Sequence, residues 1–191
     1  KIREDLTKEE LISYLCKKEK LFKENIKSWY IVKKSIDARN KNDVFYNYTI
    51  DMEYDGEYDL KDVVHVEKDK LDSINVRRKS DVRPIIIGCG PAGLFCALTL
   101  IENGVKPIIF EQGSCVDERR KEVEEFRINK KFNTLSNVQF GEGGAGTFSD
   151  GKLTTGINSS FCNKVLETFH NFGAPKEILY LSKPHIGTDR K

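Results

Sequence analysis

The segment that most constrains the fold is "PIIIGCGPAGLFCALTLIENGVKPIIFEQG", which runs from Pro84 to Gly113. Its short β-branched run predicts a strand that ends at Gly88, the apolar spacing of Leu94–Ile101 predicts a helix, and "KPIIFE" predicts a second strand. A helix between two short strands is the crossover that parallel pairing requires. The segment therefore predicts an α/β fold with a doubly wound parallel sheet.

Three glycines at the junction of strand and helix form the pattern G-x-G-x-x-G. Gly88 allows a tight turn off the strand, Gly90 lets a pyrophosphate approach the backbone, and Gly93 lets the helix pack close to the sheet. Pro91 suits the first helical turn, because its missing N–H would have no partner inside the helix. The remaining N–H groups of that turn attract phosphate, so the pattern predicts a dinucleotide site.

Glu111 ends the second predicted strand, where a carboxylate can accept hydrogen bonds from both hydroxyls of a ribose. Its charge would repel a 2′-phosphate, so the sequence favours FAD or NAD over NADP at this site. The alternative is structural: the three glycines could serve only a tight strand-to-helix turn.

The first 80 residues predict a small α+β module, separated from the rest by the polar linker "RRKSDVR". "LTKEELISYLCKKEKLF" predicts a helix with Thr7 as N-cap and Glu10 completing a capping box. Strands are predicted near "SWYIVKKSI" and over "VFYNYTIDMEY", where apolar residues alternate. We expect the alternating tyrosines to form a core face rather than a binding face. The predicted domains are residues 1–80 and residues 84–191.

Composition excludes several classes of protein. With 32 basic and 30 acidic residues the net charge is +2, so nucleic acid is not an expected partner. The apolar runs are too short to span a bilayer, and the first residues lack the apolar core of a signal peptide. Five cysteines without a C-x-x-C pair favour free thiols in a reducing cytosol over a zinc site. We expect a cytoplasmic protein without a metal.

A second glycine-rich segment, "NVQFGEGGAGTFSDGKL" at 137–153, could be a loop or the wall of a ligand site. Together with residues 84–113, the V-x-x-R of Val116–Arg119 and "GAPKEILYLSKPHIGTD", it resembles a largely uncharacterised family of bacterial FAD-dependent dehydrogenases with a glutathione-reductase-type FAD domain. These motifs cover most of residues 84–189. The N-terminal module is similar, more loosely, to the small α+β domain that precedes the FAD domain in that family.

The resemblance implies a Rossmann-like FAD domain with noncovalent FAD, whose ADP half lies on the first glycine motif and Glu111. It places Arg119 near the phosphate or ribitol side of the flavin and the second glycine-rich segment along the flavin half. The predicted cofactor contacts are Gly88, Gly90, Pro91, Ala92, Gly93, Glu111, Arg119, Gly144, Ala145, Gly146, Thr147, Ser149 and Asp150. No catalytic residue is predicted.

Two departures from the family stand out. Gln112 occupies a position where the family usually has Arg, and the sequence ends at "GTDRK", before the late Gly-Asp segment that contacts the ribitol in such folds. After residue 84 only two strands are predicted, with "EILYL" as a third candidate, whereas a complete fold has roughly five. We therefore expect an incomplete parallel sheet, the front part of a longer enzyme, and we expect residues 1–191 alone to bind FAD weakly or not at all and to be inactive.

The sequence favours an FAD-dependent oxidoreductase that passes hydride or electrons through flavin N5, with a small-molecule substrate and NAD(P)H as a candidate electron donor. One alternative is an NAD-dependent dehydrogenase with a plain Rossmann domain. Another is a noncatalytic flavin-binding or interaction protein. The substrate and the oligomeric state stay open.

Overall fold

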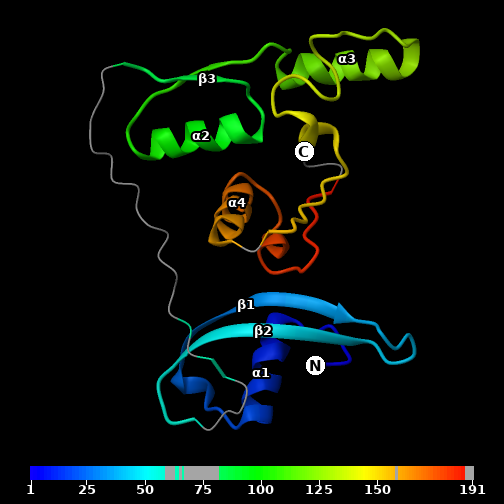
Figure 1. Cartoon of the computed structure of the whole chain (residues 1–191). Helices are drawn as coiled ribbons and strands as arrows, with labels where there is room; N and C mark the ends of the chain where they lie inside the picture. Colours follow the sequence, from blue (N-terminus) through cyan, green and yellow to red (C-terminus); the bar gives the residue numbers. More distant parts are fainter. Residues whose placement is uncertain (59–62, 65, 67–81, 158, 188–191) are drawn as a thin grey trace. The chain divides into compact units, whose positions relative to one another are not determined.

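The computed structural model describes residues 1–58, 63–64, 66, 82–157 and 159–187. The chain divides into two compact units (Figure 1). The first unit comprises Lys1–Asp69 and Lys152–Ile186, and the second comprises Lys70–Gly151 and Gly187–Lys191. The domain boundaries predicted from the sequence, at 1–80 and 84–191, stay a prediction.

The first unit begins with helix α1, Lys8–Glu19. The capping box is present as predicted: the backbone N–H of Glu10 donates to Thr7 Oγ1 at 3.3 Å, and the backbone N–H of Thr7 donates to Glu10 Oε2 at 2.8 Å. Leu11 and Ile12 are buried. A cap that satisfies N–H groups at the helix start fixes where α1 begins.

Strands β1 (Ile26–Asp37) and β2 (Phe45–Tyr54) form an antiparallel hairpin. The pairing Ile31↔Ile50 is central, and bulges shift the register on either side of Trp29. Figure 1 shows α1 beside this hairpin, and Leu11 and Ile50 line one common cavity. Both strands predicted from the alternating sequence are confirmed.

Residues 152–186 add helix α4 (Ser160–Asn171) and the 3-10 helix η3 (Lys176–Leu179) to the first unit. After η3 the chain meets the edge of β1, where Lys34 N–H donates to Tyr180 O at 2.7 Å and Ser182 N–H donates to Lys34 O at 2.9 Å. The prediction of a strand over "EILYL" is wrong. Pro175 precedes a turn in which the N–H of Ile178 donates to its carbonyl at 3.2 Å, so the chain coils there.

The second unit contains β3 (Ile85–Ile87), α2 (Pro91–Glu102) and β4 (Ile108–Phe110) in the predicted order. The two strands pair in parallel, with Ile85 opposite Ile108. Helix α3 and the 3-10 helix η2 follow; they span Val116–Asn129 and Ala145–Phe148. The described residues therefore form a mixed α/β chain with one antiparallel hairpin and one two-stranded parallel sheet.

Helix α2 covers the face of β3 that carries Ile86: a Cβ built on Gly93 would lie 3.3 Å from Ile86 Cγ2. The alternate residues Ile85 and Ile87 are 63% and 81% exposed. Parallel sheets are usually covered on both faces, whereas the Ile85 and Ile87 face of this pair is open within the described residues. Within the described part of the chain, no helix has the length and apolar character needed to cross a membrane.

Candidate functional site

The candidate site starts at the turn between β3 and α2. Gly88 has φ +96°, a backbone conformation that residues with a Cβ rarely adopt. Its N–H donates to Phe110 O at 2.7 Å. A Cβ on Gly93 would lie 2.0 Å from Gly88 O, so the helix approaches the turn more closely than any other residue allows. The backbone conformation at Gly88 and the close packing at Gly93 therefore explain these two glycines without a ligand.

Gly90 is different. It is the N-cap of α2 with φ −85°, and a Cβ built on it would meet only Gly144 Cα, at the ordinary contact distance of 3.9 Å. Pro91 and Ala92 follow in the exposed first turn, and no side chain of the described residues caps this helix end. The fold does not require glycine at position 90, and the backbone at the helix start is bare.

Glu111 lies at the carboxyl ends of both parallel strands. Its Oε2 accepts a hydrogen bond from the N–H of Cys89 at 2.7 Å, and its Oε1 accepts one from the N–H of Gly113 at 3.0 Å. The backbone N–H of Cys89, followed by that of Gly113, lowers the pKa of the Glu111 carboxyl. The side chain is therefore an anion at neutral pH, bound to the same turn that contains the glycine motif.

The second glycine-rich segment lies against this turn. The N–H of Gly143 donates to Cys89 O at 2.8 Å. Gly144 has φ +69°, and a Cβ on it would lie 3.1 Å from Pro91 Cδ and 3.3 Å from Gly90 Cα. Two segments far apart in the sequence thus meet at the N-terminus of α2.

The rest of the predicted contacts lie in and after η2. Ala145, Gly146, Ser149 and Asp150 are exposed. The hydroxyl of Thr147 donates to Glu142 O at 3.5 Å, and Ser149 Oγ accepts from the N–H of Gly151 at 3.2 Å, so both side chains bond within the segment itself. Their assignment to a cofactor stays a prediction.

Arg119 is 0% exposed, and its guanidinium lies inside the second glycine-rich segment. Its Nε donates to Asn137 O at 2.8 Å and its Nη2 donates to Val138 O at 2.9 Å. Three further carbonyls accept from Nη1: Gly141 at 3.3 Å, Glu142 at 2.6 Å and Gly144 at 2.8 Å. Phe148 lies beneath it, with the ring centroid 4.9 Å from Cζ. Burial lowers the pKa of the guanidinium.

Sequence reasoning missed a second network that fixes the same segment. The carboxylate of Glu122 accepts hydrogen bonds from the hydroxyl of Ser136, from that of Ser114 at 3.0 Å and from the amide of Asn133 at 3.1 Å. These bonds, that of Ser136 first, lower the pKa of the Glu122 carboxyl. A charged helical position looks like a solvated face in the sequence, so only the fold reveals its partners.

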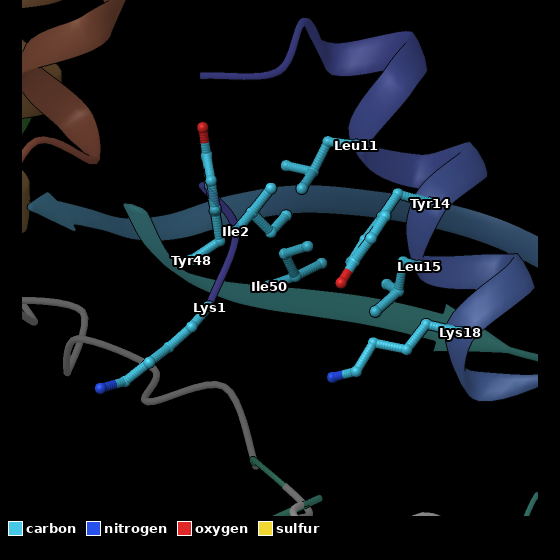
Figure 2. Close-up of a pocket in the computed structure, with 8 residues that line it drawn as sticks. All are labelled: Lys1, Ile2, Leu11, Tyr14, Leu15, Lys18, Tyr48 and Ile50. Carbon is cyan, nitrogen blue, oxygen red and sulfur yellow. The ribbon is translucent and has the colours of Figure 1, made fainter. Parts of the chain in front are cut away.

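A separate, shallow apolar cavity of about 90 Å³ lies in the first unit, between α1 and the hairpin (Figure 2). Its lining residues are Lys1, Ile2, Leu11, Tyr14, Leu15, Lys18, Tyr48 and Ile50. Lys1 pairs with Asp37 at 2.9 Å and Lys18 pairs with Glu19 at 2.9 Å. The charged ends of both lysines are thus directed to carboxylates rather than into the cavity.

Comparison with known proteins gives a partial picture. Residues 1–53 match a family described as a domain of unknown function, DUF8436. An uncharacterized protein of Clostridium beijerinckii is 46% identical over 182 residues, which is 92% of this chain and 34% of that protein. A stretch of 33 residues is 54% identical to the glutamate synthase [NADPH] small chain of Halomonas elongata, covering 17% of this chain and 7% of that protein. The chain spans about a third of the length of the C. beijerinckii relative.

Proposed function

We propose that the β3–α2 turn forms part of an FAD site and that the chain belongs to an FAD-dependent oxidoreductase. The observation that carries the proposal is the open space beside Gly90. Gly88 and Gly93 are glycines because the fold requires them, but Gly90 has room for a Cβ. A ligand that must touch the backbone at the start of the helix, as a pyrophosphate does in dinucleotide-binding folds, would account for glycine at position 90.

The charge distribution supports an anionic ligand at this position. The first turn of α2 presents backbone N–H groups with no side-chain cap among the described residues, and the helix dipole favours negative charge there. Gly144 lies beside Gly90 and Pro91, also without a Cβ. A diphosphate would therefore contact bare backbone from both segments.

Glu111 supports the assignment of a nucleotide rather than a simple anion. Its carboxylate lies at the end of β4, adjacent to the turn, and its depressed pKa keeps it charged. A carboxylate has about four lone-pair positions, so it can accept ribose hydroxyls in addition to the N–H groups of Cys89 and Gly113. Its charge disfavours a 2′-phosphate, which favours FAD over NADP. In this proposal β3, α2 and β4 are the first elements of a Rossmann-like sheet.

The oxidoreductase class rests on the short similarity to a protein named glutamate synthase [NADPH] small chain, together with the family resemblance of the motifs. When bound, FAD would accept a hydride at its N5 atom. The chain itself supplies backbone contacts for the diphosphate and an acceptor for the ribose. We propose a small-molecule substrate, NAD(P)H as electron donor and no nucleic-acid partner.

An absorption spectrum of the full-length protein, followed by anaerobic addition of NADH or NADPH, tests this function. We expect flavin absorption in the visible range and bleaching by at least one of the two nucleotides. A colourless protein that binds neither FAD nor ADP would refute the proposal. A colourless protein that binds NAD⁺ would instead support a plain nicotinamide-dependent dehydrogenase.

A further inference from the structure

Arg119 is chemically unusual because a fully buried guanidinium is bound by backbone carbonyls of the second glycine-rich segment. Removing a guanidinium from water is costly unless its donors are satisfied. Here five carbonyls, from residues 137 to 144, accept its hydrogen bonds at 2.6–3.3 Å. The segment folds around this side chain, and Gly141 allows it: a Cβ on Gly141 would lie 2.6 Å from Arg119 Cδ.

The same contacts connect Arg119 to the candidate site. The carbonyl of Gly144 accepts from Arg119 Nη1 at 2.8 Å, and the Cα of this glycine is the atom nearest to a Cβ built on Gly90. The N–H of the preceding Gly143 donates to Cys89 O. Arg119 therefore determines where the segment meets the N-terminus of α2.

We infer that Arg119 is a positioning residue. It orders the second glycine-rich segment beside the N-terminus of α2 before a ligand binds, and it does not pair with a phosphate. The inference rests on the proposed FAD site for the identity of the ligand. A segment that is already ordered lowers the entropic cost of binding. Loss of Arg119 therefore weakens the affinity for FAD without removing a contact to the ligand.

The test compares Arg119→Met and Arg119→Lys with the control Arg120→Met, which removes an exposed arginine from the next position of α3. Hydrogen exchange is measured on the cofactor-free protein. We expect faster exchange over residues 137–148 in Arg119→Met, with the β3–α2 segment unchanged. Arg119→Lys, which keeps the charge but has fewer donors, should be intermediate. Unchanged exchange over 137–148 would overturn the inference.

FAD titrations at several salt concentrations distinguish positioning from phosphate pairing. We expect FAD affinity to fall at least tenfold in Arg119→Met, with a salt dependence like that of the unaltered protein. If affinity falls, the salt dependence weakens and exchange does not change, then Arg119 pairs with the phosphate and the inference is wrong. Unchanged FAD affinity in a variant with faster exchange would also overturn it.

Two further outcomes separate this inference from the proposed function. If the unaltered full-length protein binds no FAD, the proposed function fails, whereas the hydrogen-exchange measurement still decides whether Arg119 orders the segment. If Arg119→Met does not fold, Gly141→Ala replaces it, because its Cβ presses on the Arg119 side chain while the charge is kept. Normal exchange and normal FAD affinity in Gly141→Ala would then overturn the inference.

Discussion

Gly144 lies against Pro91: a Cβ built on Gly144 would be 3.1 Å from Pro91 Cδ, and Gly144 itself has φ +69°. This contact joins the second glycine-rich segment to the first turn of α2. Both the backbone conformation and the close approach exclude a larger residue at position 144. The neighbouring Gly146 has no such constraint, because its added Cβ would meet no atom within 4 Å.

Gly144→Ala should therefore lower the free energy of unfolding by about 1–3 kcal/mol, because φ +69° with ψ −165° is a backbone conformation that essentially only glycine adopts. Gly146→Ala, the matched control, should change that free energy by less than about 0.5 kcal/mol. Chemical denaturation of both variants measures the difference. Equal stability of the two variants would contradict the contact between Gly144 and Pro91.

Gly90→Ala and Gly93→Ala should separate binding from folding. The Cβ at position 90 has room in the protein but occupies the proposed diphosphate position, so Gly90→Ala should keep its stability and lose FAD affinity. The Cβ at position 93 would collide with Gly88 O at 2.0 Å, so Gly93→Ala should lose about 1–3 kcal/mol of stability. Denaturation curves and FAD titrations of each variant provide the measurement. Unimpaired FAD binding by Gly90→Ala would count against the proposed site.

Glu111→Gln should lower stability in a pH-dependent way. The N–H groups of Cys89 and Gly113 lower the pKa of this carboxyl below its ordinary value of 4.5. A depressed pKa in the folded state stabilises the protein above pH 4.5, and this stabilisation is lost as the pH falls through the folded-state pKa. The stability gap between the unaltered protein and Glu111→Gln should thus be full at pH 7 and narrow below pH 4.5.

Urea denaturation between pH 7 and pH 3.5 measures that gap. Glu118→Gln, which neutralises an exposed carboxylate on α3, provides the control for a general loss of negative charge. If the gap for Glu111→Gln does not depend on pH, the hydrogen bonds from Cys89 and Gly113 do not stabilise the charged form.

Local sequence patterns predicted the local elements well. The capping box of Thr7 and Glu10 and the alternation along β2 depend on neighbouring residues, so they appear in the sequence as they do in the structure. The glycine motif, placed between two β-branched runs, likewise predicted β3, α2 and β4. The error at "EILYL" has a local cause, because Pro175 starts a 3-10 turn in an otherwise strand-like run.

Long-range partners could not be predicted in the same way. The carbonyls that bind Arg119 and the backbone bonds that join Lys34 to residues 180 and 182 carry no side-chain signature. The sequence placed Arg119 near the cofactor through its family resemblance, whereas the structure shows which atoms it binds. In the candidate site, the spacing of residues in the sequence predicted the glycine motif and Glu111. The contact of Gly144 with Pro91 could be seen only in the folded structure.

The first unit offers a test of its own at Lys34. Its Nζ donates to both carboxylate oxygens of Asp5, at 2.5 and 2.7 Å, and the hydroxyl of Tyr48 donates to the same carboxylate at 2.8 Å. The Lys34 side chain is 19% exposed, whereas that of Asp5 is 47% exposed. Solvent screening at Asp5 reduces the strength of this pair.

Lys34→Met should therefore lower the free energy of unfolding by only about 0.5–1 kcal/mol, since it removes the charged donor of a partly exposed Asp5. Hydrogen bonding from Lys34 lowers the pKa of the Asp5 carboxyl, so the loss should be full at neutral pH and shrink as the pH falls below 3.8. Lys33→Met is the control, because Lys33 is exposed on the adjacent position of β1. Denaturation at pH 7 and pH 3 compares the variants. A loss of the same size in Lys33→Met would mean that strand position, and not the pair with Asp5, sets the effect.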